Sequence, residues 1–197
     1  IWAITIVLLE VPSGALADHL GRKKLVVMSA ILMILEILIL LFTPIGSSFV
    51  FSLFVINRIL SGAAEAAASG ADEAMAYECI PEANRQVLWS RTMKRTMIGM
   101  SIGFVITSIT GALVYSPELI NSLLHMVGLE GSLTKVHTLK FPLFLNLITA
   151  IIVFLIAIRF EEKSETPGPT KHRFNAIRES FSGTIRAGHW ILKSPAA

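Results

Sequence analysis

Long apolar segments with almost no charge limit this chain to a membrane fold. The clearest runs from Leu25 to Phe42, in which Glu36 is the only charged side chain. A helix of this length crosses the hydrocarbon core of a bilayer. The composition agrees, since the chain is 53% hydrophobic and 16% charged, and its mean hydropathy of +0.68 is too high for an ordinary soluble domain. We therefore expect an all-α integral membrane protein.

Five apolar segments are predicted to cross the bilayer as helices, and together they form a partial helical bundle over residues 1–160. The segments are 1–17, 25–42, 49–79, 97–115 and 141–160. Between the last two, Glu118 to Leu129 is predicted to form a short surface helix. Residues 161–197 are expected to leave the membrane as a cytoplasmic loop. Apolar residues at helical spacing between Phe174 and Ile185 favour an amphipathic surface helix there, with a linker as the alternative.

The distribution of positive charge predicts the orientation of these helices. Fourteen of the 17 lysines and arginines fall in segments 22–24, 85–95 and 159–193, whereas Lys135 and Lys140 fall in the loops expected outside. Cytoplasmic loops of membrane proteins carry an excess of positive charge. The three basic segments are therefore expected on the cytoplasmic side.

Several other classes of protein are excluded. The net charge of +3 is too small to indicate nucleic-acid binding. A single cysteine, Cys79, excludes an internal disulfide and a cysteine-rich metal site. The five histidines lack the spacing of metal ligands, and the sequence has neither a phosphate-binding glycine loop nor a nucleophile paired with a base. We expect no enzyme activity, no metal and no cofactor.

Polar and small side chains form a stripe along the third segment, 49–79. Steps of three and four residues place them on one face of a single predicted helix. The members are Arg58, Gly62, Glu65, Ser69, Asp72 and Ala76. The other faces carry apolar residues, so the stripe is expected to face protein or a water-filled cavity instead of lipid.

Of the residues in this stripe, Arg58 has the largest free-energy cost of burial in a membrane. A guanidinium near the middle of a bilayer stays charged and costs about 2.5 kcal/mol or more. Counted from the segment ends, Arg58 lies about 13 Å and Glu36 about 18 Å into the membrane from opposite faces, which predicts a similar depth. Glu10 and Glu65 are further candidate partners. The sequence leaves two alternatives, a buried ion pair that fixes helix packing or a site for substrate and protons.

Carboxylates supply the candidate proton carriers. A carboxylate in a poorly hydrated cavity holds a proton more readily than one in water, which suits Glu65 and Glu10. Two carboxylates seven residues apart, Glu65 and Asp72, are an alternative cation site. Asp72 and Glu73 are expected near the inner interface, where a solvated carboxylate or a helix cap is as good an interpretation as a functional group.

A charged hairpin joins the first two segments, and it resembles a known family signature. Its residues Gly14, Asp18, Gly21, Arg22 and Lys23 resemble the loop motif between the second and third helices of the major facilitator superfamily. His19 stands where that family usually has arginine. The resemblance implies a gating role, in which Asp18 pairs with cations in one conformation and releases them in another. A topological anchor is the alternative.

Two further segments extend the resemblance. Residues 58–64 resemble the superfamily's fourth-helix motif, with Ser61 in place of the usual glutamine, which implies a role in proton coupling for Arg58. Gly99 and Gly103 form a small-x-x-x-small pair that allows close helix contact. This pair matches half of a fifth-helix motif of proton-driven exporters, without its proline and glycine pair.

The resemblance covers nearly the whole chain and implies five helices, the second to sixth, of an N-terminal six-helix bundle. We interpret the chain as an internal fragment whose partner is a missing second bundle. The implied function is secondary active transport of a small solute, coupled to protons and favouring export, by alternating access in a bacterial cytoplasmic (inner) membrane. The implied partners are the bilayer, the solute and protons. An importer, an uncoupled facilitator and a non-transporting scaffold or sensor are the alternatives.

Overall fold

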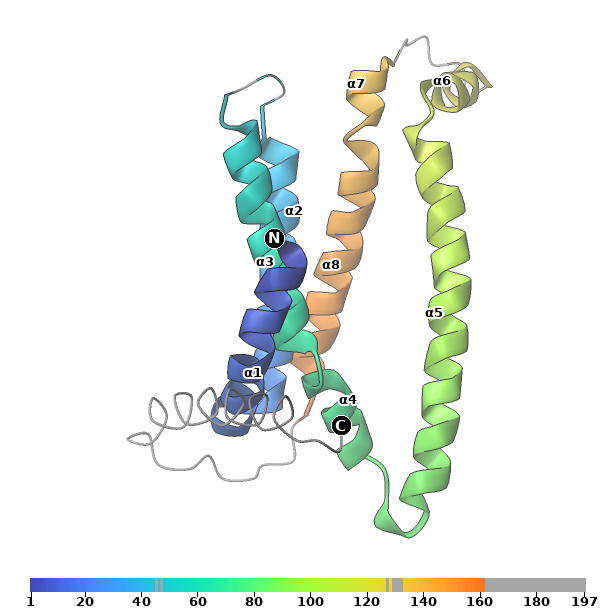
Figure 1. Cartoon of the computed structure of the whole chain (residues 1–197). Helices are drawn as coiled ribbons and strands as arrows, with labels where there is room; N and C mark the ends of the chain where they lie inside the picture. The colour runs from blue at the N-terminus through green and yellow to red at the C-terminus, as the bar shows by residue number, and fades with distance from the viewer. Residues whose placement is uncertain (45, 47, 127, 129–132, 162–197) are drawn as a thin grey trace, which may run out of the picture. The chain divides into compact units, whose positions relative to one another are not determined.

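A computed structural model describes residues 1–161 except 45, 47, 127 and 129–132 (Figure 1). Every regular element among these residues is a helix, which confirms the all-α prediction. The elements are α1 (Trp2–Leu20), α2 (Arg22–Phe42), α3 (Val50–Ala68), α4 (Ala71–Glu78), the 3₁₀ helix η1 (Glu82–Asn84), α5 (Arg85–Tyr115), α6 (Pro117–Met126), α7 (Lys135–Thr138) and α8 (Phe141–Arg159). The amphipathic helix predicted within 161–197 lies outside the described residues.

Four stretches of the described chain are long and apolar enough to cross a bilayer. They are Arg22–Phe42, Val50–Glu78, Glu82–Tyr115 and Phe141–Arg159. The apolar part of α1, Trp2–Gly14, is shorter. These stretches correspond to four of the five predicted membrane segments.

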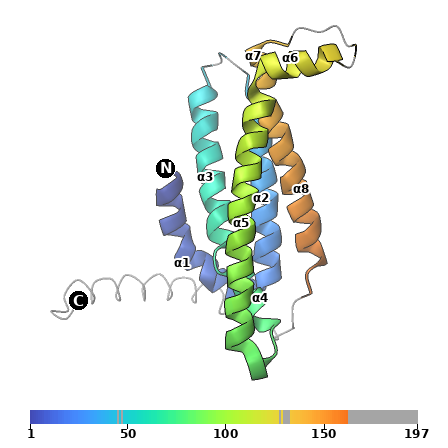
Figure 2. The same cartoon turned by 90° about the vertical axis from the view of Figure 1, so that its right-hand side faces the viewer.

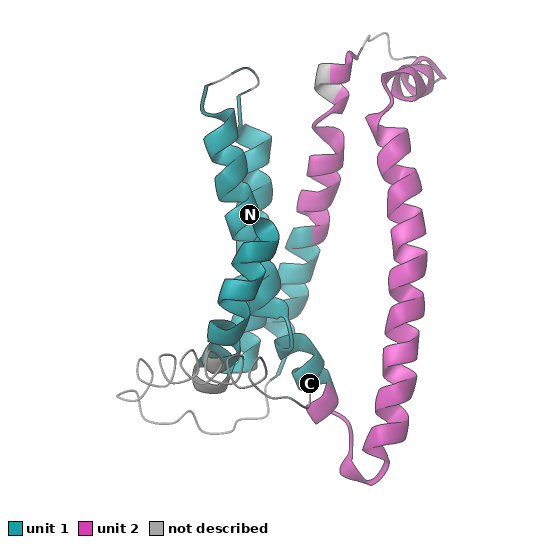
Figure 3. Ribbon diagram, in the orientation of Figure 1, with its two compact units in different colours: residues 1–76, 150–197 teal, residues 77–149 magenta. Residues whose placement is uncertain are grey.

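The chain divides into two compact units (Figure 3). Unit 1 consists of residues 1–76 and 150–197, and unit 2 consists of residues 77–149. α8 begins in unit 2 and ends in unit 1.

Unit 1 is built around α3, which packs against both α2 and α1. The contact is lined by small residues on α3, where Gly62, Ala64, Ala66 and Ala67 are buried. Small side chains let helix backbones approach closely, which is how membrane helices associate without a hydrophobic driving force. The core of unit 1 therefore combines buried alanines and glycine of α3 with larger buried residues of α2, such as Leu25 and Ile37.

The connection between α1 and α2 is a single residue, Gly21. Its φ of 95° and ψ of 143° lie in a region that only glycine adopts readily. The hairpin predicted from the charged motif is thus shorter than expected, because α1 continues to Leu20 and α2 begins at Arg22.

The prediction of one continuous helix over residues 49–79 is wrong. α3 ends at Ala68 and α4 begins at Ala71. Ser69 has φ −52° and ψ 120°, and Gly70 has φ 75°. These are the values of the two central residues of a type II turn, which needs glycine at its second central position. The stripe therefore leaves its helix face after Ser69, and Asp72 and Ala76 belong to another helix.

Unit 2 is dominated by α5, which begins at Arg85 instead of near the predicted residue 97. No residue of α5 is buried. α6 turns sideways from the end of α5 (Figures 1 and 2) and matches the surface helix predicted within 118–129. The Asn121 side chain donates a hydrogen bond to the Leu133 carbonyl at 3.1 Å and accepts one from its N–H at 2.8 Å.

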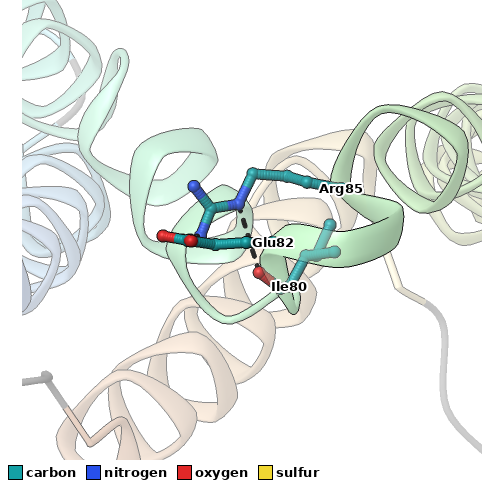
Figure 4. Close-up of polar contacts among 3 residues, drawn as sticks. All are labelled: Ile80, Glu82 and Arg85. Atoms are coloured by element: carbon teal, nitrogen blue, oxygen red, sulfur yellow. Dashed lines mark hydrogen bonds and ion pairs between the residues drawn. The ribbon is translucent and has the colours of Figure 1, made fainter.

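The other end of α5 is fastened by Arg85 (Figure 4). Its Nε donates to the Ile80 carbonyl at 3.2 Å, and its Nη2 lies 3.8 Å from the Glu82 carboxylate. The guanidinium also stacks over Tyr77, 5.2 Å from the ring centroid, and Tyr77 meets Trp89 edge to face at 5.3 Å. The segment predicted as a basic link is therefore a short turn followed directly by helix.

Candidate functional site

Arg58 lies on α3 and is partly buried in unit 1. Its Nε and Nη2 donate to the side-chain oxygen of Asn57 at 2.9 and 2.7 Å. Its guanidinium also lies over the Phe54 ring, 5.4 Å from the centroid. An amide dipole and a ring face both offset part of the cost of a buried cation. Among the described residues, no carboxylate forms an ion pair with Arg58.

Asn57 is the site residue that sequence reasoning missed. It is only 1% exposed, and its Nδ2 donates to the backbone carbonyl of Glu36 at 2.8 Å. Asn57 therefore ties α3 to α2 and receives Arg58 at the same time. The only sequence signal was an asparagine inside an apolar segment, directly before the arginine, because its partner on α2 is a backbone atom.

Glu36 lies on α2, and its backbone carbonyl accepts the hydrogen bond from Asn57 of α3. Its side chain is partly buried, and its Oε2 atom is fully buried without a hydrogen-bond partner in the described structure. An unpaired buried carboxylate is costly, because it loses its hydration and gains nothing in return. The structure thus brings residues 36, 57 and 58 together, linked through Asn57.

Glu10 and Glu65 lie elsewhere on unit 1. The Glu10 Oε1 accepts a weak hydrogen bond from the Ser69 hydroxyl at 3.4 Å, which joins α1 to the end of α3. The Glu65 side chain is exposed on α3. Among the described residues neither carboxylate forms an ion pair with Arg58, so these two candidate partners are not paired with it in this structure.

Asp72 is separated from these groups by the turn at Ser69 and Gly70. It lies in the first turn of α4, is exposed, and its Oδ1 accepts a hydrogen bond from the Glu73 N–H at 2.8 Å. A carboxylate in this position accepts from a backbone N–H that has no partner within the helix, and its negative charge interacts favourably with the helix dipole. The geometry matches the capping alternative.

The predicted gating residues surround the single-residue connection at Gly21. Arg22 and Lys23 are the first two residues of α2, whereas Gly14 lies in α1, where an added Cβ would meet no described atom within 4 Å. Asp18 belongs to the last turn of α1. Its side chain lies outside the described part of the structure, so its pairing stays a prediction.

The glycines predicted to serve helix packing differ sharply. A Cβ at Gly62 would lie 2.7 Å from the Thr5 Cβ and 2.8 Å from the Trp2 carbonyl oxygen, so α1 and α3 meet there. A Cβ at Gly99 or Gly103 of α5 would meet nothing within 4 Å. Only the first glycine has a packing partner among the described residues.

One comparison with known proteins identifies a family. The model of the Major Facilitator Superfamily matches residues 1–192. No match was found among curated proteins or among solved structures.

Proposed function

Since the chain belongs to the Major Facilitator Superfamily and is part of a multi-pass membrane transporter, we propose that this transporter moves a small solute coupled to protons. Alternating access of two helix bundles is the mechanism that the proposal implies. We propose export as the direction, from the Gly99 and Gly103 half-motif, and a bacterial cytoplasmic membrane as the location. The remaining partners are the solute, protons and a second bundle.

The observation that carries this proposal is the setting of Arg58. The structure has a permanently charged guanidinium inside a membrane helix, held by a neutral amide and an aromatic ring. Ionisable groups inside a membrane are costly and mark substrate or proton pathways by default. A guanidinium that has no carboxylate partner among the described residues can also exchange its neutral partners for an anionic one when the conformation changes.

The roles of the other residues follow from their places. Glu10 and Glu65 are the proposed proton carriers. Both lie near the end of α3, where the Ser69 hydroxyl donates a hydrogen bond to Glu10. Asp72, in the neighbouring α4, is proposed to face the same aqueous entrance. Gly14, Asp18, Gly21, Arg22 and Lys23 form the proposed gate.

Flux measurements on the full-length protein in proteoliposomes test the coupling. Arg58→Gln and Glu65→Gln are each expected to reduce proton-driven solute flux by about tenfold or more, because each removes a charge that the cycle uses. Asn146→Leu, which replaces an exposed side chain on α8, is the matched control and is expected to keep wild-type flux. Flux that ignores the proton gradient in the wild type would indicate a facilitator, and absence of flux for every tested solute would favour a scaffold.

A further inference from the structure

One side of α6 is apolar and exposed in the described structure. Leu119, Leu123 and Met126 follow one another at steps of four and three residues, so they share one face of the helix. Their exposed fractions are 45, 58 and 83%. Large apolar side chains on a common helix face are normally covered by protein or by lipid, because their exposure to water is unfavourable.

The neighbouring side of α6 is polar. Glu118, Ser122 and His125 also recur at helical spacing, and all three are exposed. α6 therefore presents an apolar face and a polar face to its surroundings. This is the pattern of a helix that lies in the plane of a membrane interface.

A third side of α6 is held by its own unit. Ile120 and Leu124 are partly buried, and α6 packs against α5. The Asn121 side chain bonds to the N–H and the carbonyl of Leu133 at 2.8 and 3.1 Å, and it lies about 200° around the helix from Leu119. These contacts fix the rotation of α6 and therefore fix the side that it exposes.

The start of α6 explains its direction. Ser116 is extended, with φ −80° and ψ 114°, and Pro117 has no N–H to continue the hydrogen bonds of α5. The Ser116 hydroxyl donates to the Glu118 carboxylate at 3.0 Å and accepts a long hydrogen bond from the Leu119 N–H at 3.5 Å. A new helix therefore follows directly after Ser116, and it runs across the axis of α5 instead of along it (Figures 1 and 2).

The end of α5 from which α6 departs lies at the expected membrane boundary. Arg95 is the last charged residue of α5, and the uncharged stretch from there to Tyr115 is about 30 Å long, similar to the hydrocarbon core of a bilayer. The Lys135 Nζ lies 5.7 Å from the centroid of the exposed Tyr115 ring. Tyrosine is enriched at membrane–water interfaces, and lysine extends its charge toward them. α6 thus leaves α5 at the level of the lipid headgroups.

We infer that α6 is an interfacial membrane anchor, with Leu119, Leu123 and Met126 inserted among the lipids and its polar face in water. The partner is the bilayer surface on the outer side, which the distribution of lysine and arginine assigns to this end of α5. The anchor sets the depth of α5, which buries no residue along its length. The inference is independent of the solute, the direction and the proton coupling proposed above.

Lipid is a better occupant of this face than a second copy of the chain. Three apolar side chains are far fewer than the roughly 20–30 residues that each partner contributes to a stable protein interface. A lipid surface needs no such area here, because α6 is joined directly to a membrane-spanning helix. Its insertion is therefore an intramolecular step at high effective concentration.

Spin-label accessibility in the full-length protein tests this assignment. Nitroxide labels are attached to single cysteines in a background whose native cysteines, Cys79 included, are replaced by serine. The apolar-face variants are Leu119→Cys, Leu123→Cys and Met126→Cys, and the matched polar-face controls are Glu118→Cys, Ser122→Cys and His125→Cys. In vesicles of phosphatidylcholine and phosphatidylglycerol, relaxation is measured with oxygen, which concentrates in lipid, and with a nickel chelate, which stays in water.

We expect the ratio of oxygen to nickel accessibility to be about fivefold or more higher on the apolar face than on the polar face, because the two reagents partition in opposite directions across the interface. The adjacent pair Ser122→Cys and Leu123→Cys gives the sharpest contrast. Met126, the most exposed of the three apolar residues, gives the same reading if a leucine variant does not fold.

Three results would overturn the inference. Equal nickel accessibility on both faces would place α6 in water, away from the bilayer. Exclusion of both reagents from the apolar face would show that protein covers it instead of lipid. Exclusion of nickel from the polar face as well would place the whole helix below the interface.

Discussion

Units 1 and 2 both contain helices long and apolar enough to cross a bilayer, but they differ in how those helices are held. In unit 1, α3 buries Asn57, Gly62 and three alanines against its neighbours. In unit 2, the long α5 buries no residue at all, and the described polar contacts to other elements lie at its ends, around Arg85 and Tyr115. The difference is between a helix fastened along its length and one fastened at its termini.

This difference shows that hydropathy and packing are separate properties of a membrane helix. Lipid tails are as apolar as leucine, so an apolar surface alone gives helices no reason to associate. Association needs close backbone approach or a polar bond across the interface, and unit 1 has both, at Gly62 and at Asn57. α5 has the small residues Gly99, Gly103 and Gly111, but in the described part of the chain no atom of another element lies within 4 Å of a Cβ added at any of them.

The sharpest test of this comparison exchanges equivalent glycines for leucine. In Gly62→Leu, the new Cβ would overlap Thr5 and the Trp2 carbonyl, so α1 must separate from α3 at a cost of about 3 kcal/mol or more. In Gly99→Leu, no described atom lies within 4 Å of the new Cβ, and the expected change is below about 0.5 kcal/mol. Thermal denaturation of the purified full-length protein in detergent measures the change in stability for both variants.

The outcome at Gly99 decides how the comparison is read. Equal losses at both positions would mean that α5 is packed as tightly as α3, against a partner outside unit 2. A small loss at Gly62 would mean that the contact between α1 and α3 is loose enough to take a larger side chain. Either result would break the contrast between the two helices.

The sequence predicted the helices better than their interruptions. Hydropathy predicted α8 to within one residue and the end of α2 at Phe42, although α2 begins three residues earlier than predicted, at Arg22. A membrane-spanning helix needs a long apolar run, which is visible directly in the sequence. The sequence pattern missed the turn at Ser69 and Gly70, since the three- and four-residue spacing of small residues continues across it. It also placed the start of α5 too late, because Arg91, Lys94 and Arg95 were read as a loop although lysine and arginine are good helix formers.

The candidate site was predictable by type but not by contact. Arg58 and Glu36 were both selected from the sequence, and in the structure Asn57 bonds to the Arg58 side chain and to the Glu36 backbone. Asn57 was missed because its partner on α2 is a backbone carbonyl. Every residue has such a carbonyl, so no complementary pair of side chains in the sequence indicates this contact. The expected ion pairs of Arg58 with acids require a tertiary arrangement that spacing along one helix cannot predict.

A second test compares a turn of unit 1 with a helix of unit 2. Gly21→Ala places a Cβ at φ 95° and ψ 143°, and we expect a loss of about 1–3 kcal/mol, because this region is strained for any residue but glycine. Gly111→Ala adds a Cβ inside α5 that would meet no described atom of another element within 4 Å, and this variant is expected to gain up to about 1 kcal/mol from helix propensity. Thermal denaturation in detergent reports both, and opposite signs are the prediction. A neutral Gly21→Ala would show that α1 and α2 connect differently in solution.

The smallest expected effects concern the polar end of α5. Arg85 bonds to the Ile80 carbonyl and stacks on Tyr77, whereas its ion pair with Glu82 spans 3.8 Å to a side chain that is 89% exposed. Exposed ion pairs contribute little, so Glu82→Ala is expected to cost less than about 0.5 kcal/mol, and Arg85→Ala about 1 kcal/mol through the lost hydrogen bond and ring contact. The thermal midpoint in low and high salt separates the two, because screening weakens only the ion pair. If Glu82→Ala matched Arg85→Ala and the loss vanished in salt, charge pairing and not the carbonyl and ring contacts would fasten this end of α5.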